Sequence, residues 1–300
     1  MTTSVLATAL LAGCSLLAGC GSGPNQFGSA AIVGSQSVSL AELQRQVDSV
    51  LAKPQVMQSV SLQGGQPADI SQVMVTNDVQ HLLLTEAARR DNVVINDKQV
   101  DAILAQQGGA EAIAAQSIFD PAGVRQAVRD QLTSEALAIK NVDRLSVTVD
   151  SVRTGSRAEA LAVAQQLAAG PAKAEAALRV AGPNGQLNQQ MRAWQPDAIA
   201  YLGTLPGQVV AAQTAQSTWT VWRVTRRDMD AAAAPGAASQ LDDQTLNRIG
   251  RRLLQPVASE LGVRVNPRYG EWDLVQVSVL PKTVEPSIVL AAAPNPAPSV

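Results

Sequence analysis

Few aromatic residues, few lysines and a single histidine characterise this 300-residue sequence. Phe, Trp and Tyr together make up 3% of the residues, so the core must be built mainly from Ala, Val, Leu and Ile. The formal net charge of −2 provides no basic surface for nucleic acid. After residue 20 no apolar run is long and uninterrupted enough to span a bilayer. These absences argue against a nucleic-acid-binding protein and against an integral membrane protein.

Groups that usually carry catalysis or bind metals are also scarce. The single histidine, His81, lies in a helical pattern, where such a residue is more often a surface or half-buried side chain than a catalyst. No His, Cys and Asp residues cluster at the spacing of metal ligands. Asp242-Asp243 is typical of a helix cap with a favourable dipole charge. We therefore expect no catalytic residue, metal, cofactor or small-molecule substrate, although a hydrolase whose two carboxylates meet only in the fold stays open.

An apolar run at the N-terminus ends in Leu17-Ala18-Gly19-Cys20, and Gly21-Ser22-Gly23-Pro24 follows. Small residues before the cysteine let the peptide bond enter a processing site, and the thiol can take a diacylglycerol. The pattern resembles a bacterial lipobox. The resemblance implies a signal peptide over residues 1–20, a lipid on Cys20, a flexible tether over 21–29, and anchorage to the extracytoplasmic side of the cell membrane.

One feature of the lipobox pattern is missing, because no Lys or Arg precedes Arg45 to form a positive n-region. The alternative is a buried apolar helix in which Cys14 and Cys20 are two free thiols or one disulfide. If Cys20 is lipidated and Cys14 removed, the mature chain has no free thiol.

The chain is organised around Asp78–Leu104, which reads as two helices. Val79, Leu83 and Ala87 recur at the spacing of one helix face. The link that follows, residues 93–95, is three β-branched residues in a row and favours an extended backbone. Asn96 with a Gln three residues later is a capping box, so the second helix begins there.

Further caps extend this helical region in both directions. Ser39 with Glu42 forms a capping box, and Asp120 before Pro121 is an N-cap with proline at the first helical position. Together with the apolar stripes that follow them, these caps predict four or five helices. We expect one α-domain over residues 30–142, opened by a short strand.

The hydrophobic period changes after residue 142. Leu145–Asp150 alternates apolar and polar residues and predicts a strand, and Trp219–Val224 is predicted to be the last strand of the region. Between them, Ser156 with Glu159 caps a helix, and a second short helix precedes a Gly-rich turn. Residues 143–228 are therefore a mixed region, followed by an Ala-rich linker over 229–240.

The C-terminal part is predicted to be a helix, a turn and a tail. Asp242 caps a helix that Pro256 is expected to kink or divide. The apolar stripe of this helix consists of Leu246, Ile249, Leu253 and Val257. The helix and a turn at 266–273 fall in a segment over 241–280, and the Pro/Ala-rich residues 281–300 are predicted to be disordered. The whole chain is expected to be α+β and mainly α.

Two parts of the sequence resemble known families. The run Leu-Leu-Leu-Thr-Glu-Ala-Ala-Arg-Arg with the restart Ile-Asn-Asp-Lys-Gln-Val-Asp is similar to the N-terminal chaperone domain of the SurA/PrsA/trigger-factor-like group. The element order in 143–228 is similar to a parvulin domain. These resemblances imply a SurA-like helical domain completed by the C-terminal helix, with a degenerate parvulin-like region between them. The Ala- and Arg-rich composition suggests an actinobacterial source.

The parvulin-like pattern departs from the family at its motifs. Gly185-Gln186-Leu187 stands in place of the family's Gly-rich turn, and Gly207-Gln208-Val209 in place of the Gly-Glu-Val before the closing strand. The first strand offers Val147–Asp150 where the family often has a histidine. No catalytic set can be carried over, apart from an isolated Asp150.

The sequence therefore predicts a membrane-anchored, extracytoplasmic, chaperone-like lipoprotein. It would bind unfolded or exported polypeptides in an apolar cradle without conventional prolyl isomerase catalysis. The alternative is a structural or scaffolding envelope lipoprotein that binds a single folded partner, and a residual peptidyl-prolyl isomerase is less favoured. Four tryptophans are expected to be core residues more than the lining of a peptide groove: Trp194, Trp219, Trp222 and Trp272.

Overall fold

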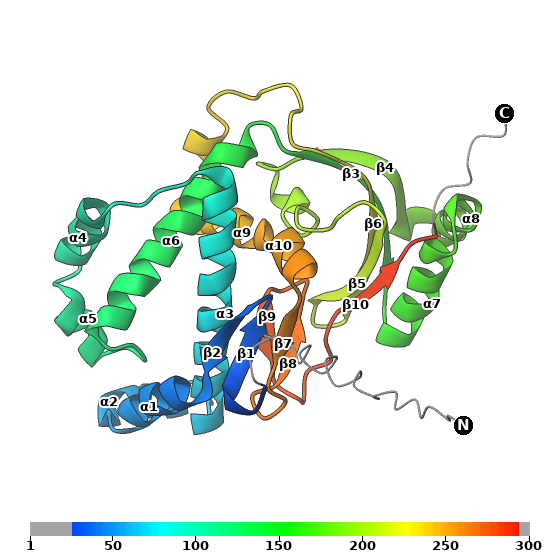
Figure 1. Cartoon of the computed structure of the whole chain (residues 1–300). Helices are drawn as coiled ribbons and strands as arrows, with labels where there is room; N and C mark the ends of the chain where they lie inside the picture. Colours follow the sequence, from blue (N-terminus) through cyan, green and yellow to red (C-terminus); the bar gives the residue numbers. More distant parts are fainter. Residues whose placement is uncertain (1–25, 294–300) are drawn as a thin grey trace, which may run out of the picture.

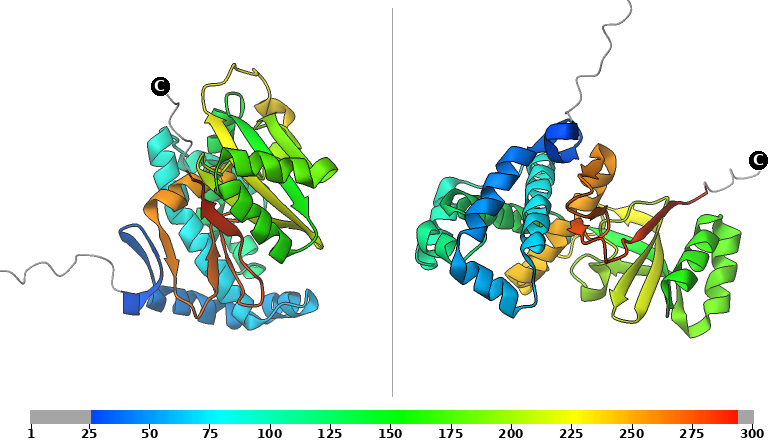
Figure 2. Two further views of the ribbon diagram at one scale, coloured as in Figure 1. Left: turned by 90° about the vertical axis from the view of Figure 1, so that its right-hand side faces the viewer. Right: turned by 90° about the horizontal axis from the view of Figure 1, so that it is seen from below.

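The computed structural model describes residues 26–293 as a helical lobe and a sheet lobe. The helical lobe contains the N-terminal helices and two late helices, α9 (Asp243–Arg252) and α10 (Leu254–Leu261). The sheet lobe lies beside it, with α7 (Arg157–Ala168) and α8 (Pro171–Ala181) on its outer side (Figures 1 and 2). The described residues are mixed helix and strand, which is compatible with the α+β class, and more of them lie in helices than in strands. Short 3-10 turns lie at 26–28, 182–184, 196–198 and 238–240.

A small antiparallel sheet joins the two ends of the helical lobe. Strand β1 (Ser29–Val33) is buried along its whole length and pairs with β2 (Gln36–Ser39) on one side and with β7 (Val263–Val265) on the other. The Ser39 hydroxyl then accepts a hydrogen bond from the Glu42 amide, 3.3 Å away, and so caps α1 (Leu40–Leu51). This is the N-cap half of the predicted capping box, because the Glu42 carboxylate bonds to Gln46 and Arg45 instead of to the Ser39 amide.

The predicted pair of helices around residue 90 is confirmed. Helix α3 (Pro67–Asp91) follows α2 (Pro54–Leu62) and ends at Asn92, which adopts a left-handed conformation. Helix α4 (Asp97–Gln106) begins at Asn96, whose side chain and that of Gln99 each accept a hydrogen bond from the other's amide at 3.0 Å. The face of α3 predicted to be apolar is buried: Val79, Leu83 and Ala87.

The helical lobe continues with α5 (Ala110–Ala115) and α6 (Pro121–Val142). The Asp120 carboxylate accepts a hydrogen bond from the Gly123 amide at 2.6 Å, which is the predicted N-cap of α6. Helices α4, α5 and the first half of α6 enclose a small apolar cluster of their own. Its buried members are Val100, Leu104, Ala114, Val124 and Val128.

The sheet lobe is a five-stranded sheet with the order β10-β5-β6-β3-β4, antiparallel at every pair. Its strands from the middle of the chain are β3 (Ser146–Thr154), β4 (Gly185–Arg192), β5 (Gln208–Ala215) and β6 (Thr218–Asp228). Helices α7 (Arg157–Ala168) and α8 (Pro171–Ala181) cover one face through an Ala- and Val-rich cluster. Figure 2 shows the two helices side by side on this face.

The region around Gly185 differs from the prediction. Gly185-Gln186-Leu187 was expected to be a Gly-rich turn, and it is the start of β4, which pairs with β3 at the edge of the sheet. Most of β4 is exposed and carries no alternating apolar pattern. Because it is an edge strand held by backbone hydrogen bonds, its sequence lacks the usual strand signal.

The late helices pack back onto the N-terminal ones. Asp242 caps α9 (Asp243–Arg252), and α10 (Leu254–Leu261) follows at once. The break falls at Leu253, so Pro256, expected to mark it, lies inside the first turn of α10, where its missing amide costs nothing. Helix α9 crosses α6 so closely that a Cβ on Gly250 would lie 1.9 Å from the Ser134 carbonyl oxygen.

The prediction of a disordered C-terminal tail is wrong for residues up to 293. After the hairpin of β8 (Glu271–Asp273) and β9 (Ser278–Leu280), the chain crosses to the sheet lobe, where β10 (Ile288–Ala291) pairs with β5. The short apolar run Ile288–Leu290 supplies this edge strand, and its Pro/Ala-rich surroundings hid it. The sheet of the mixed region is therefore completed by residues 288–291 and is not closed by residues 143–228 alone.

One apolar core links both lobes. It includes Leu83 and Leu137 from the helices, Val149 and Trp222 from the sheet, and Leu254 from α10. Trp219 and Trp222 are buried, as expected for core residues, whereas Trp272 is half-buried and Trp194 is exposed at 37% of its surface. The two lobes are thus parts of one packed unit.

Candidate functional site

The helical lobe contains a cleft of about 1020 Å³ whose walls are four helices. Helix α3 contributes residues at 73–74, 77–78, 80–81 and 84. These positions repeat every three or four residues and therefore lie on one face of the helix. Helix α6 does the same at 122–123, 126–127 and 130–131, while α1 and α9 supply the remaining walls. Helical spacing on every wall shows that the cleft is built by the packing of the helices.

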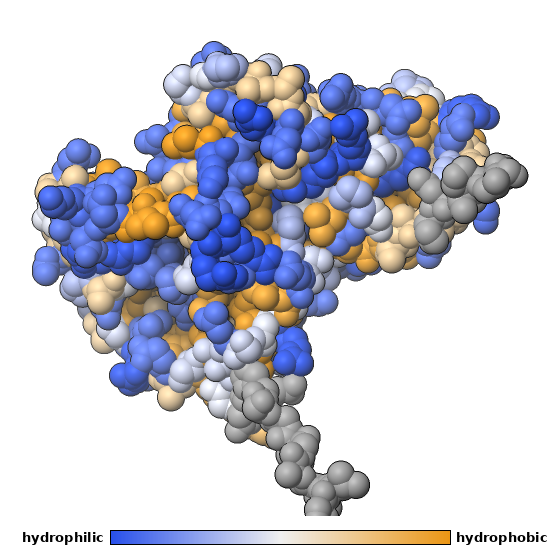
Figure 3. All heavy atoms as spheres, turned by 45° about the horizontal axis from the view of Figure 1, so that its top comes forward, coloured by the Kyte–Doolittle hydropathy of each residue, from blue (hydrophilic) through white to orange (hydrophobic). Residues whose placement is uncertain are grey.

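The lining of the cleft mixes apolar and polar groups. Val73 is 46% exposed, and Ile118 and Phe119, which also line the cleft, are half-buried. Met74 and Leu84 form the buried part of the apolar surface. On the face shown in Figure 3, hydrophobic patches alternate with hydrophilic ones and form no single continuous surface. Such a lining offers several separate weak contacts to a bound chain.

His81 and Asp130 meet across the cleft. The Nδ1 atom of His81 lies 2.9 Å from Oδ1 of Asp130, and the Gln126 amide donates to the same carboxylate oxygen at 2.9 Å. The hydrogen bond to Asp130 raises the pKa of His81 above its ordinary value, against the opposite effect of burial. The sequence placed His81 on a helix as an ordinary side chain, whereas the fold brings it to a carboxylate.

Asp78 lies one turn before His81 on α3 and lines the same cleft. Within residues 26–293 no hydrogen bond or ion pair at salt-bridge distance reaches its carboxylate. Burial raises the pKa of Asp78 to about 6, although the nearby His81 lowers it and Asp130 raises it further. The cleft thus contains a carboxyl group that is partly dehydrated and has no bonded partner.

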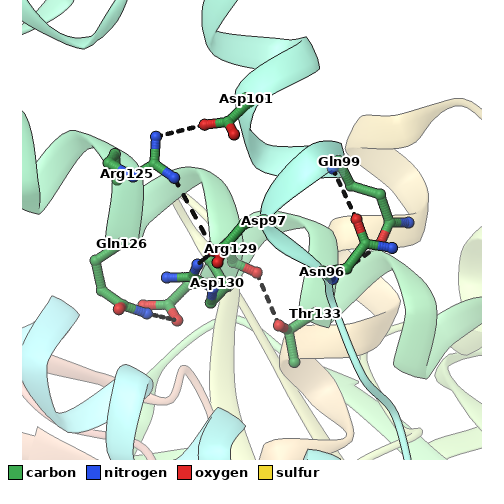
Figure 4. A network of polar contacts seen from close by, with 9 residues as sticks. All are labelled: Asn96, Asp97, Gln99, Asp101, Arg125, Gln126, Arg129, Asp130 and Thr133. Carbon is green, nitrogen blue, oxygen red and sulfur yellow. Dashed lines mark hydrogen bonds and ion pairs between the residues drawn. The ribbon is translucent and has the colours of Figure 1, made fainter.

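Helix α6 directs its arginines away from the cleft. Figure 4 shows Arg125 and Arg129 turned toward α4, where Arg125 donates to Asp101 at 2.6 Å and Arg129 bonds to Asp97. Gln126 and Asp130, one position further along the helix in each case, lie on the cleft side. The two faces of α6 therefore carry opposite charge, and the negative one faces the cleft.

Arg251 closes the cleft at α9. Its guanidinium donates to Asn247 at 2.8 Å and also bonds to the Gln80 side chain, whose own amide donates to the Val277 carbonyl at 2.7 Å. Burial lowers the pKa of Arg251, and Asp130 opposes this shift. The cation is thus held by neutral amides, which fix its position without neutralising it.

Lys53 connects the α1 side of the cleft with the α6 side through three hydrogen bonds. Its ammonium donates to the carbonyls of Ala114 at 2.9 Å, Ser117 at 3.2 Å and Phe119 at 2.7 Å. The residue lies between α1 and α2, whereas its three acceptors lie at the end of α5 and before α6. One side chain therefore links the two sides of the cleft.

Asp150, the isolated candidate of the parvulin-like region, is fully buried in the sheet lobe. One carboxylate oxygen accepts from the Asn188 amide at 2.7 Å, and the other accepts from Arg223 Nε at 2.7 Å. Both oxygens are used for structure, and neither faces the cleft. The sheet lobe does have a second groove of about 1090 Å³, which is lined by α7, α8 and the end of β3 and includes the exposed Val180.

Several predictions concern residues outside 26–293. Cys20, the predicted lipidation site, and Cys14 lie outside the described residues, so the lipid anchor stays a prediction. In the part of the chain that is described, no helix has the length and apolarity to cross a membrane. The same part contains no group of three or more His, Cys, Asp or Glu side chains arranged to hold a metal ion.

Sequence reasoning missed the cleft because its residues lie far apart in the chain. Asp78 and His81 are i, i+3 neighbours, but Asp130 and Arg251 join them only through helix packing. One signal was present in the sequence, since polar and apolar residues alternate by turn along α3 from Val73 to Leu84.

No known protein family model matches the chain, and no curated protein matches it. Among solved structures, the chain is similar to the foldase protein PrsA from Streptococcus pneumoniae str. Canada MDR_19A, with 13% identity, coverage of 66% of this chain and 87% of that one, and a TM-score of 0.24. It is also similar to the peptidylprolyl isomerase PrsA from Bacillus anthracis, with 13% identity, coverage of 64% and 97%, and a TM-score of 0.22. Superpositions at these scores do not assign a shared fold.

Proposed function

We propose that this protein is an extracytoplasmic chaperone-like lipoprotein that binds unfolded or exported polypeptides in the cleft of its helical lobe. The observation that carries the proposal is the cleft itself, which has a volume of about 1020 Å³ and is lined by both apolar and polar groups. A site that must accept many sequences needs several weak contacts rather than a single deep and specific pocket.

The proposed activity is binding without prolyl isomerisation. Asp150 accepts hydrogen bonds on both carboxylate oxygens, so it has no free group to offer a substrate. The one histidine lies in the helical lobe, whereas the parvulin-like pattern lies in the sheet lobe. We expect the purified protein to leave the rate of cis–trans exchange in proline peptides unchanged, and a catalysed rate would contradict this part of the proposal.

The anchor is proposed from the sequence pattern. A diacylglycerol on Cys20 and the tether that follows would hold the binding lobe close to the membrane on the side where exported chains emerge. Mass spectrometry of the N-terminal peptide tests this directly, because lipidation adds the mass of the acyl groups to Cys20. The relation to SurA- or PrsA-like proteins and the actinobacterial source likewise rest on sequence patterns.

The test of polypeptide binding is suppression of aggregation for two unrelated substrates during their unfolding. We expect the protein to suppress both. Ala127→Trp places a large side chain in the cleft and should abolish suppression, whereas Ala105→Trp, on the exposed side of α4, should leave it intact. If the two variants behave alike, the cleft is not the binding site.

The second candidate function is a scaffold that binds one folded envelope partner. The groove at α7 and α8 favours it, because its lining is largely apolar and Val180, one of the lining residues, is 89% exposed. Such an exposed apolar surface is typical of a contact site for another protein. Recovery of one stoichiometric partner, lost in Val180→Asp and kept in Ala127→Trp, would favour the scaffold over the chaperone.

A further inference from the structure

We propose that the cleft prefers polypeptide segments in which a basic side chain lies between apolar ones, with the carboxylate of Asp78 as the partner of the cation. This proposal rests on the proposed function and specifies the class of polypeptide. It follows from the charges on the four walls, from their partners and from the apolar groups around them.

Asp78 differs from the other acidic residues of the cleft in lacking a bonded partner while being half-buried. Glu42 pairs with Arg45, Asp120 caps α6, and Asp130 binds His81. Asp243 is exposed at the rim, where it begins α9. A partly dehydrated carboxylate without a partner gains more from an incoming cation than an exposed or already paired one does.

The cations of the helical lobe are not available to fill this position. Arg125 and Arg129 are bonded to α4, and Arg45 pairs with Glu42. Arg251 is held by the side chains of Asn247 and Gln80. The charged and titratable groups that line the cleft are Glu42, Arg45, Asp78, His81, Asp120, Asp130, Asp243 and Arg251. Acidic residues outnumber arginines among them, so the cleft attracts positive charge.

Apolar groups lie close to Asp78 along the same wall. Met74 precedes it by one helical turn, and Val73 is exposed beside Met74 in the lining. Phe119 contributes an aromatic ring to the same cleft, a suitable neighbour for a guanidinium or for an apolar side chain. The combination selects for a basic residue with apolar neighbours and against an acidic one.

The experiment compares three labelled peptides that differ at one central position, Arg, Gln or Glu, between identical apolar flanks. Binding to the full protein is measured by fluorescence anisotropy at pH 7.5 and low salt. We expect the Arg peptide to bind about tenfold more tightly than the Glu peptide, a difference of the size that one charge-assisted contact provides. The Gln peptide should fall between them.

Two variants locate the source of the preference. Asp78→Asn should bind the Arg and Glu peptides with nearly equal affinity and still bind all three. Asp101→Asn, which removes an exposed carboxylate of α4 outside the cleft, should keep the preference. Circular dichroism and thermal unfolding verify that both variants are folded.

The outcomes separate this inference from the proposed function. Equal binding of the three peptides by the unaltered protein overturns the basic preference and leaves polypeptide binding standing. A preference that survives Asp78→Asn overturns the assignment to Asp78. Absence of binding by all three peptides overturns both, and self-association that Asp78→Asn removes would identify a second copy of the chain as the occupant.

Discussion

The two lobes each contain a buried or half-buried aspartate, and the two carboxylates differ in their hydrogen-bond partners. Asp150 in the sheet lobe is completely buried and has a partner at each oxygen, Arg223 and the Asn188 amide. Asp78 in the helical lobe is half-buried in an open cleft, and in the described chain no hydrogen bond or close ion pair reaches its carboxylate. A buried charge with all partners in place is part of the scaffold, whereas a partly buried charge without one is available to a ligand.

The comparison predicts opposite effects when each carboxylate is removed. Asp150→Ala should destabilise the protein by about 3–5 kcal/mol, because it leaves the Arg223 guanidinium buried without its counter-charge. Urea unfolding followed by circular dichroism measures this change. The control is the double variant Asp150→Leu with Arg223→Met, which removes both charges and should be less destabilised. A loss below about 1 kcal/mol for Asp150→Ala would contradict the structural role.

The contact between α6 and α9 tests whether the cleft depends on the late part of the chain. Gly250→Ala would bring a methyl group against the Ser134 carbonyl, so the two helices must separate. We expect a loss of about 2–3 kcal/mol, at the high end for overpacking. Gly155→Ala is the control, because its Cβ would meet nothing closer than 3.7 Å. Equal stability of the two variants would show that the close helix crossing is wrong.

Asp78→Asn should stabilise the protein at pH 8, in contrast to Asp150→Ala. Burial raises the pKa of Asp78 from 3.8 to about 6, so the folded protein binds a proton at this site more tightly than the unfolded chain does. The ionised Asp78 carboxylate therefore lowers the free energy of unfolding. This loss of stability is absent below about pH 4, increases as the pH rises to about 6, and reaches its full size at higher pH.

The expected gain from Asp78→Asn is about 1–3 kcal/mol at pH 8 and close to zero at pH 4. Unfolding curves at both pH values measure it, with Asp101→Asn as the exposed control. His81 also makes the protein less stable as the pH rises. Its pKa is raised in the folded protein, so the stability that protonated His81 adds is lost as the pH rises through its folded-state pKa. A gain that is equal at both pH values would contradict burial as the cause.

Lys53→Met gives the smallest expected effect, a loss of about 1 kcal/mol or somewhat more. The methionine keeps much of the side-chain length but cannot donate to the carbonyls of Ala114, Ser117 and Phe119, which water can partly satisfy. Amide hydrogen exchange should rise in residues 110–119 and stay unchanged in β3 and β6. Uniform acceleration in both lobes would instead indicate global destabilisation.

The sequence was most informative where structure is local. The caps at Ser39, Asn96, Asp120 and Asp242 were found because each depends on a side chain and an amide three residues away. Edge strands were the weak point, since β4 and β10 are defined by pairing to distant strands and carry little pattern of their own. The candidate site was hidden for the same reason.

By itself, the sequence determined where α1, α4, α6, α7 and α9 begin, which helix faces are apolar, and that the chain is mixed helix and sheet, because short-range hydrogen bonds and hydrophobic periodicity decide these features. Only the tertiary structure decided that Asp78, His81, Asp130 and Arg251 share one cleft, that Asp150 is paired, and that residues 288–291 complete the sheet. These relations join residues dozens of positions apart, and the close crossing of α6 and α9 at Gly250 that helps to create them depends on side-chain volumes at both helices.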